Sequence, residues 1–421
     1  MRYLILILLL ALLSSCRRNF EVVVPDLTWD QFQSLSAKPL DSTVRKRLEG
    51  VYAINQATDV FGPQAVLKWT YTALGKDTTW HLSMFCEKDV SYFICEGRRS
   101  DTVILLNGYW RKMVGTETGR ARFTISKRNG SLQLLDSSVF NPANLSISGT
   151  FGKGEEIPVT PITLNYNRGL YKSTPLEIVA HRLGGRTSDL LPASENSVEM
   201  LKLASSFGAT GVETDVRMTK DGVPIVYHDA TLNERLITKN GMVGPIENFT
   251  YAQLDALVRL QKGEHIPKLT DVLKTLVTAT PLRYVWLDTK YSGDLQPIRE
   301  LQKTYMQMAA NLGKPLLITI GIPDQGVLDN FLKLPGYTSI PSVCELEIAD
   351  VEKANSMIWG PRWTMGLQND KVNQVHSEGR KAFIWTLDVP ENIVEFMNDG
   401  HFDGILSNYP SAVAYYYYAK Q

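Results

Sequence analysis

Hydrophobic and polar positions follow two different patterns in the two parts of this chain. Between about residues 50 and 168, apolar and polar residues alternate in short runs rich in Thr, Val, Tyr, Phe and Trp. A period of two is typical of strands with one buried face, and closely spaced short strands are typical of antiparallel folds. This part therefore predicts an all-β sandwich or barrel-like domain. The runs are 65–71, 80–85, 91–94, 102–106 and 120–125.

After residue 168, short apolar runs alternate with stretches of helical periodicity. In the stretch 194–207, Val198, Leu201, Ala204 and Phe207 recur at a helical interval. Alternating strands and helices indicate a parallel sheet, and eight strands over this length predict an α/β TIM barrel. The predicted strands are 176–180, 211–216, 223–227, 284–287, 316–320, 343–346, 382–385 and 404–406.

The chain begins with an apolar run, 4–13, which follows Arg2. Ten residues cannot span a bilayer, which needs about 20, and the pattern is typical of a signal peptide. Leu13-Ser14-Ser15-Cys16 resembles the bacterial lipobox, which implies that Cys16 becomes the first mature residue and carries a lipid anchor. We then expect a lipoprotein of the bacterial cell envelope, on the periplasmic or outer-surface face. The alternative is ordinary secretion with Cys16 incidental.

These patterns divide the chain into four segments. We expect a signal peptide at 1–15, a tether with a short helix at 16–45, the β-rich domain at 46–168 and the barrel at 169–421. Thr28 is placed to cap the short helix, which would run through Leu35.

Composition excludes several classes of protein. Of the 421 residues, 44% are hydrophobic and 21% charged, as in ordinary globular proteins. Lys+Arg and Asp+Glu both number 44, so the chain lacks the basic surplus of a nucleic-acid binder. Cys86 and Cys95 could form a disulfide or remain buried thiols, and Cys344 has no clear partner. No cysteine and histidine spacing indicates zinc.

Polar residues stand at the ends of six predicted strands. The carboxyl ends of barrel strands form the active face of a TIM barrel, so these side chains should converge. They are His181-Arg182, Glu213 and Asp215, His228-Asp229, Asp288 and Lys290, 385–388, and Asn408.

The acidic members of this set predict a metal site. Glu213 and Asp215 are two residues apart on one strand, so both point to the same face, where they repel unless a cation neutralises them. Asp288 can supply a third oxygen, and an all-carboxylate site favours one divalent metal, Mg²⁺ or Ca²⁺.

The basic members of the set predict phosphate chemistry. His181 and His228 can act as acid and base on opposite sides of a reacting group, and which is which stays open. Arg182 and Lys290 add positive charge that suits a phosphate oxyanion. The sequence therefore predicts a phosphoryl-transfer site.

These residues carry a resemblance to a known family, the glycerophosphodiester phosphodiesterases, over residues 176–412. The resembling blocks are His181-Arg182, Ser194-Glu195-Asn196, ETDVRMTKDGVPIVYHD at 213–229, IPKL at 266–269, LDTK at 287–290, IWTLD at 384–388 and FDGILSNYP at 402–410. The resemblance implies a metal-dependent TIM barrel that hydrolyses small-molecule glycerophosphodiesters to glycerol 3-phosphate and an alcohol. It implies that Glu213, Asp215 and Asp288 bind the metal, that His181 and His228 are the acid/base pair, and that Arg182 and Lys290 bind the phosphate.

Other matching positions have supporting parts. Glu195 could orient Arg182, Asn196 belongs to the same block, and Trp385 could stack on the substrate or simply border the core. The sequence departs from the family at Leu183, Ser194, Asp288 and Asn408. Head-group preference and the choice between Ca²⁺ and Mg²⁺ stay open, as does the role of the first domain. The alternatives are a phospholipase-type activity on intact lipid and a non-catalytic surface binding lipoprotein.

Overall fold

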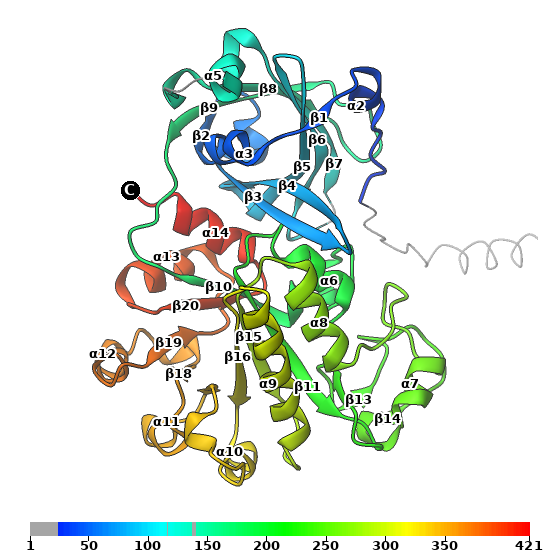
Figure 1. Ribbon diagram of the computed structural model, residues 1–421, viewed down its shortest axis with the longest axis vertical. Coiled ribbons are helices and arrows are strands. Elements are labelled where there is room, and N and C mark those ends of the chain that lie inside the picture. The colour runs from blue at the N-terminus through cyan, green and yellow to red at the C-terminus, as the bar shows by residue number, and fades with distance from the viewer. Residues whose placement is uncertain (1–23, 116, 137–139) are drawn as a thin grey trace, which may run out of the picture.

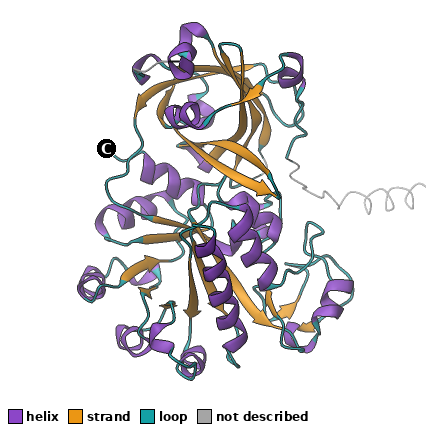
Figure 2. Cartoon of the chain, viewed as in Figure 1, coloured by secondary structure: helices purple, strands orange, loops and turns teal. Residues whose placement is uncertain are grey.

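The alternating runs and the βα pattern fold into two barrels, which lie at opposite ends of the molecule (Figure 1). The computed structural model describes residues 24–115, 117–136 and 140–421. The predicted signal peptide and Cys16 lie outside the described residues. Figure 2 shows strands in the upper part and strands wrapped by helices in the lower part.

The first barrel is antiparallel and closed. Each strand pairs with the next along the chain, and β9 pairs back onto β2, so the predicted all-β domain is a barrel rather than a sandwich. A short strand, β1 (Lys38–Pro39), pairs antiparallel with Arg98 and Arg99 near the end of β5. The ring strands are β2 (Gly50–Ile54), β3 (Gln64–Leu74), β4 (Asp77–Cys86), β5 (Ser91–Ser100), β6 (Val103–Lys112), β7 (Thr118–Ile125), β8 (Ser146–Phe151) and β9 (Thr160–Arg168).

Side chains fill the interior of this first barrel. Inward positions alternate with outward ones along each strand, and the inward ones are large and apolar. Phe61, at the end of the short helix α4 (Thr58–Phe61), packs its ring against Phe93, Trp110 and Phe151. The other helices here are α2 (Asp30–Ser34), α3 (Ser42–Leu48) and α5 (Ser131–Asp136).

The structure corrects one prediction for the first part and decides between two alternatives for another. Helix α2 is N-capped by Trp29 without a side-chain hydrogen bond, because the Thr28 hydroxyl instead accepts from Arg122. Cys86 and Cys95 are separate buried thiols. The residue of β4 opposite Cys95 is Leu82, and at about 3.3 Å per residue Cys86 lies roughly 13 Å along the strand, beyond disulfide reach.

The second barrel is a closed ring of parallel strands, as the βα pattern predicts. The ring runs β10–β11–β15–β16–β17–β18–β19–β20 and closes onto β10. Its strands are β10 (Glu177–Ala180), β11 (Gly211–Met218), β15 (Tyr284–Thr289), β16 (Leu317–Ile322), β17 (Ser342–Cys344), β18 (Ile358–Trp359), β19 (Lys381–Ile384) and β20 (Gly404–Ser407).

One predicted barrel strand is wrong, and one barrel strand was not predicted. The run 223–227 contains β12 (Pro224–Val226), which pairs antiparallel with β11 outside the ring. The turn between β11 and β12 is too short for a parallel crossover, which needs about a dozen residues or more, so these strands form a hairpin. Strand β18, which consists of only Ile358 and Trp359, completes the ring.

Helices follow the barrel strands and cover the ring. Helix α6 begins after Ser197, whose hydroxyl caps the amide of Met200, so residues 194–196 belong to a loop rather than to the predicted helix. None of the described helices is long and apolar enough to cross a membrane. The helices are α6 (Val198–Ala204), α7 (Tyr251–Leu257), α8 (Leu269–Ala279), α9 (Gln296–Asn311), α10 (Gln325–Phe331), α11 (Ile348–Ala354), α12 (Asn369–Ser377), α13 (Pro390–Asp399) and α14 (Pro410–Tyr418).

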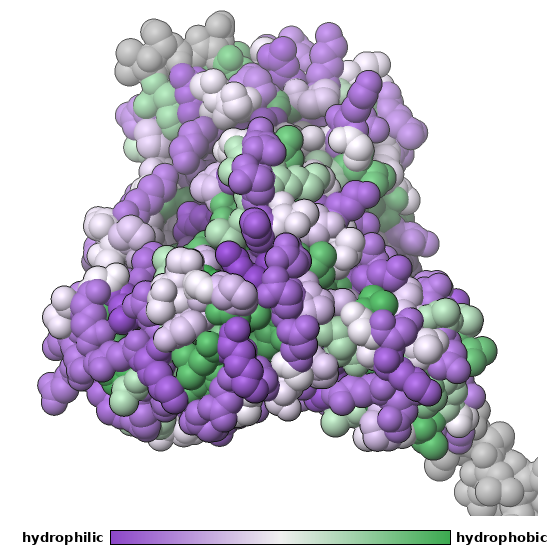
Figure 3. All heavy atoms as spheres, turned by 60° about the horizontal axis from the view of Figure 1, so that its bottom comes forward, coloured by the Kyte–Doolittle hydropathy of each residue, from purple (hydrophilic) through white to green (hydrophobic). Residues whose placement is uncertain are grey.

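An insertion between β11 and α8 has a small apolar core of its own, which includes Ile225, Leu236 and Leu254. It contains the hairpin strand β12, the short strands β13 (Thr231–Leu232) and β14 (Gly244–Pro245), and helix α7. The surface turned forward in Figure 3 is covered mainly by hydrophilic side chains, with hydrophobic ones in separate groups.

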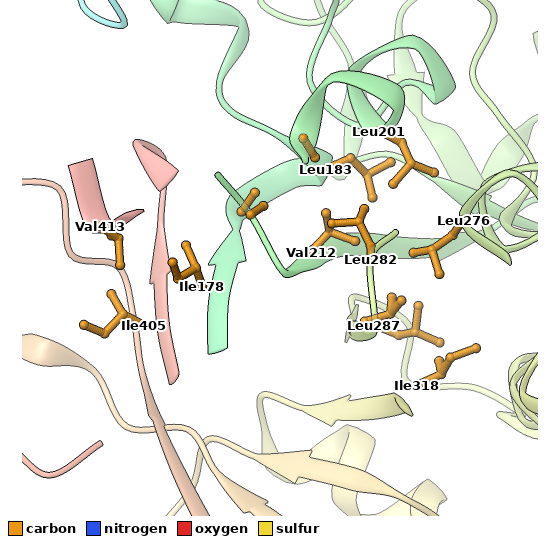
Figure 4. Close-up of a cluster of buried hydrophobic side chains, with 14 of the residues drawn as sticks. Ile178, Leu183, Leu201, Val212, Leu276, Leu282, Leu287, Ile318, Ile405 and Val413 are labelled. Carbon is orange, nitrogen blue, oxygen red and sulfur yellow. The ribbon is translucent and has the colours of Figure 1, made fainter. Parts of the chain in front are cut away.

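The two barrels share one apolar core. Figure 4 shows its part between the ring and helices α6, α8 and α14, where Leu201, Val212, Leu276 and Val413 lie. Outward residues of the first barrel, such as Phe85 and Tyr92, belong to the same cluster, and the ring of Tyr92 lies 5.3 Å from that of Phe207.

A glycine allows the barrels to approach closely at this interface. Gly208 has φ +96°, and a β-carbon there would lie 2.5 Å from that of Ala414 in α14 and 3.0 Å from the ring of Phe85 in the first barrel. A larger residue would therefore meet both backbone strain and a clash between the barrels.

Candidate metal and phosphate site

The predicted site residues converge at the carboxyl end of the second barrel. His181 and Arg182 follow β10, Glu213 lies on β11, and Asp288 lies on β15. They line a cavity of about 230 Å³. The other lining residues are His228, Trp286, Lys290, Pro323, Glu345, Arg362, Trp385, Thr386 and Leu406.

Three carboxylates face one another at the base of this site. Asp215 and Asp288 are register partners on adjacent parallel strands. Glu213 lies two residues before Asp215 on the same strand, so both side chains point to the same face. One carboxylate oxygen from each of the three lies within 4.8 Å of the others. Among the described residues, each carboxylate has one buried oxygen that accepts no hydrogen bond: Oε1 of Glu213, Oδ1 of Asp288, and Oδ1 of Asp215, which lies 3.4 Å from Lys290 Nζ. Buried oxygens without donors are costly, so this donor set fits a hard divalent cation.

The second oxygen of each carboxylate is held in place. Glu213 Oε2 accepts from the backbone amide of Arg182 at 2.8 Å, and Asp215 Oδ2 accepts from Asn196 Nδ2 at 2.7 Å. Asp288 Oδ2 accepts from Lys290 Nζ. The positions of the three carboxylates are therefore fixed by the protein, which leaves the unpartnered oxygens for a ligand.

The carboxylates strongly affect one another's pKa. Burial, together with the charges of Asp215 and Asp288, raises the pKa of Glu213 well above its usual value. Burial also raises the pKa of Asp288, although Lys290 opposes this. Burial acts to raise the pKa of Asp215 as well, but His228 and Lys290 outweigh it and the pKa is lowered.

His181 is held as a neutral imidazole with a defined tautomer. Asn408 donates from Nδ2 to Asp388 at 2.6 Å, so its Oδ1 is directed to His181 Nδ1, 2.7 Å away. Because an amide oxygen only accepts, Nδ1 of His181 carries the proton and Nε2 has a free lone pair. Burial and the charge of Arg182 lower the pKa of His181 to about 3. Nε2 lies 3.7 Å from Glu213 Oε2.

His228 has a different partner. Its Nδ1 lies 2.6 Å from Asp229 Oδ1, and its Nε2 lies 4.0 Å from Asp215 Oδ1. It follows the hairpin strand β12 rather than a barrel strand, so the predicted origin of this histidine is wrong although the predicted convergence is correct. The hairpin returns β12 alongside β11, and this brings His228 over the carboxylates.

The carboxylate of Glu195 holds the side chain of Arg182. Arg182 Nη1 donates to Glu195 Oε1 at 2.8 Å, and the carboxylate also accepts from the amide of Thr187 and from Arg235. The Arg182 side chain is mostly buried, and its Nε has no partner among the described residues. A buried guanidinium with an open donor beside the cavity is suited to an anionic group.

Several residues at the site were not predicted. Glu345 follows β17 and lines the cavity, where its burial raises its pKa well above the usual value. Arg362 lies with its guanidinium carbon 4.9 Å from the centre of the Trp385 ring. The indole of Trp385 donates to Gly360, which fixes the ring at the cavity wall. Glu345 ends a predicted strand, so position gave a signal for it, whereas Arg362 follows the unpredicted strand β18.

Part of the chain is similar to known proteins. Residues 168–314 match the model of the glycerophosphoryl diester phosphodiesterase family. A glycerophosphodiester phosphodiesterase of Caldanaerobacter subterraneus subsp. tengcongensis is 35% identical over 105 residues, which are 24% of this chain and 40% of the relative. A glycerophosphocholine phosphodiesterase of Candida albicans is 32% identical over 139 residues, 30% of this chain and 12% of the relative.

Solved structures are also similar to part of this chain. A glycerophosphodiester phosphodiesterase of Parabacteroides distasonis aligns with 57% of this chain and 96% of its own, with 23% identity and a TM-score of 0.44. The chain spans less than half the length of both relatives named above. The family match lies in the second barrel together with the preceding linker, and the first barrel lies outside it.

Proposed function

We propose that this chain hydrolyses glycerophosphodiesters to sn-glycerol 3-phosphate and an alcohol, using one divalent metal and two histidines. The observation that carries the proposal is the set of three carboxylates with unpartnered oxygens, which faces two imidazoles in one cavity. The family match over residues 168–314 supports the same reaction. Glu213, Asp215 and Asp288 would hold the metal, Ca²⁺ or Mg²⁺.

A bound divalent cation would supply Lewis-acid stabilisation of the charge that develops on the phosphate. Two of the positive side chains that line the cavity, Arg182 and Lys290, bind the phosphate oxygens. The two imidazoles have different hydrogen-bond partners, and we assign them different roles on that basis. The carboxylate of Asp229 accepts from Nδ1 of His228 and orients the ring, so His228 is assigned as the proton donor to the leaving alcohol. His181, on a neutral amide, accepts the proton of the attacking oxygen at Nε2.

The test uses a soluble variant that lacks residues 1–16 and measures sn-glycerol 3-phosphate released from glycerophosphocholine. We expect release that depends on Ca²⁺ or Mg²⁺. Parallel assays on intact phosphatidylcholine distinguish a phospholipase-type activity. Binding of glycerophosphocholine without turnover under any metal would contradict the proposal and indicate a binding protein.

We also propose that Cys16 carries a lipid anchor that holds the protein at the bacterial cell envelope. Its support is the lipobox-like Leu13-Ser14-Ser15-Cys16 that follows an apolar run. Expression in a bacterium with radiolabelled palmitate should label the wild-type chain and leave Cys16→Ala unlabelled. Equal labelling of both chains would contradict the anchor.

A further inference from the structure

An arginine of the first barrel reaches the active-site loop of the second. Arg111 lies on β6 and follows Trp110, which points into the first barrel, so Arg111 points outward toward the interface. Its side chain is completely buried. Its Nη2 donates to the carbonyl oxygens of Leu190 at 2.8 Å and Asp189 at 3.0 Å.

This contact is unusual for a buried cation. The hydrogen bonds of Arg111 within the described chain go to backbone carbonyls, of Gly115, Asp189 and Leu190, and its Nε and Nη1 have no partner there. Burying a guanidinium without a carboxylate is unfavourable, and an apolar side chain would fill the interface at lower cost. The distinctive contribution of arginine at this position is therefore its hydrogen bonds to the carbonyl oxygens of Asp189 and Leu190.

The loop that Arg111 contacts has several residues in the left-handed backbone conformation. Between residues 182 and 197, four non-glycine residues have left-handed φ angles: Arg182 at 52°, Leu183 at 66°, Leu190 at 55° and Asn196 at 60°. Such conformations persist only where the surroundings enforce them. Leu190, one of the four, gives its carbonyl oxygen to Arg111.

Hydrogen bonds connect the turn that Arg111 contacts to the residues that face the cavity. The turn Thr187–Asp189 contacts Glu195 twice, through the Thr187 amide at 2.9 Å and the Thr187 hydroxyl at 3.2 Å. Glu195 in turn orients Arg182. On the other side, the carboxylate of Asp189 contacts Tyr409, which directly follows Asn408, the partner of His181.

We infer that Arg111 is a positioning residue of the active site, through which the first barrel fixes the loop 182–197 that presents Arg182 to the phosphate. The inference rests on the proposed function for its catalytic consequence only. The first barrel thus acts as part of the active-site framework. The metal ligands Glu213, Asp215 and Asp288 lie on barrel strands, and the loop contributes one hydrogen bond each to Glu213 and Asp215, from Arg182 and Asn196.

The test replaces Arg111 by methionine, which keeps an unbranched apolar stem but removes the donors. The control is Arg168→Met, because Arg168 also donates from the first barrel to a backbone carbonyl across the interface, at Ala419 in the C-terminal segment of the chain. Hydrogen–deuterium exchange reports on the loop 182–197, and calorimetry reports binding of sn-glycerol 3-phosphate and of the metal alone.

We expect Arg111→Met to increase exchange in the loop 182–197 and to weaken sn-glycerol 3-phosphate binding about 10- to 100-fold, because small displacements of a charged clamp have effects of that size. Metal affinity should fall less than product affinity, because strands β11 and β15 carry the carboxylates and the loop supplies only one hydrogen bond each to Glu213 and Asp215. kcat/KM for the diester should fall together with the product affinity. Arg168→Met should leave loop exchange and product affinity unchanged.

The inference is overturned if Arg111→Met leaves loop exchange at the wild-type rate, or if Arg168→Met reproduces its effects, which would indicate general loosening of the interface. If Arg111→Met does not fold, Arg111→Lys is used. One ammonium can retain one of the two carbonyls, so we expect a smaller change in the same direction, and none would also overturn it. If wild-type protein lacks diesterase activity while exchange in Arg111→Met increases selectively, the proposed function fails and the positioning role of Arg111 stands.

Discussion

At the residue scale, each carboxylate of the site divides its two oxygens between structure and ligand. One oxygen is tied to the protein by a donor from the loop 182–197 or by Lys290, and the other accepts no hydrogen bond from the described residues, although Lys290 Nζ lies 3.4 Å from Asp215 Oδ1. This arrangement fixes three ligands before a cation arrives, which lowers the cost of organising them. It also explains why Asn196, which bonds Asp215 through Nδ2 and accepts from Thr214 through Oδ1, belongs to the site without facing the substrate.

We predict that Asp288→Asn lowers metal affinity at least about tenfold, because an amide offers a weaker neutral ligand in place of a carboxylate. Calorimetry with Ca²⁺ and Mg²⁺ measures the change. Asp255→Asn is the matched control, since Asp255 is bound to His265 away from the cavity and its loss should leave metal affinity unaltered. Unchanged affinity in Asp288→Asn would remove this residue from the ligand set.

The two imidazoles make the second prediction at this scale. His181→Ala and His228→Ala should each reduce kcat by about 10²-fold or more, because each removes one proton transfer. Thermal unfolding should show that both variants remain folded. His265→Ala, which alters an exposed pair with Asp255, should keep wild-type kcat. Wild-type turnover in either active-site variant would refute the acid/base roles.

Much of the site could be predicted at the residue scale because close spacing on one strand determines which side chains share a face. Glu213 and Asp215 follow this rule, and Asp288 lies opposite Asp215 as expected for neighbouring strands. The pairing of Asn408 with His181, and the presence of Arg362 beside Trp385, could not be predicted. These contacts join residues from distant strand ends, and no local pattern encodes such a distance.

At the scale of elements, the longer strands and the helices follow the hydrophobic period, and the exceptions are short. Strand β18 contains only Ile358 and Trp359, too few residues to show any period. The run 223–227 has the period of a strand, but its pairing is decided by the length of its connection to β11. Closure of the first barrel, which depends on pairing between β2 and β9, likewise has no local signal.

The ring of Phe61, which packs inside the first barrel, gives a prediction at this scale. Phe61→Ala should lower the free energy of unfolding by about 3–5 kcal/mol, because it opens a cavity among Phe93, Trp110 and Phe151. Urea unfolding followed by tryptophan fluorescence measures it. Leu74→Ala, at a position that is 77% exposed, should change stability by at most about 0.5 kcal/mol. A loss below about 1 kcal/mol in Phe61→Ala would show that the core collapses around the gap.

At the scale of the whole molecule, the two barrels depend on each other through an apolar interface. Tyr92 and Met113 of the first barrel pack in the same cluster as Phe207 and the tyrosines of α14. The sequence predicts two units of different texture. The sequence could not predict that apolar residues of the two units pack together. Apolar residues on the outer face of a barrel strand have the same pattern whether a helix, a loop or another domain covers them.

We predict that residues 169–421 expressed alone aggregate, because removal of the first barrel exposes this apolar face. Size-exclusion chromatography of the fragment beside the chain without residues 1–16 measures the effect. A monodisperse fragment with an unchanged melting temperature would show that the interface contributes little to the second barrel.

The most direct test of the central claim is a metal titration of activity. Protein stripped with a chelator is mixed with glycerophosphocholine and increasing Ca²⁺ or Mg²⁺, and the released sn-glycerol 3-phosphate is measured. The carboxylate cluster and the paired imidazoles predict release that is absent without metal, saturates with it and is lost in Asp288→Asn. Release at the full rate in chelator, or none at any metal concentration from folded protein, would contradict a metal-dependent diesterase.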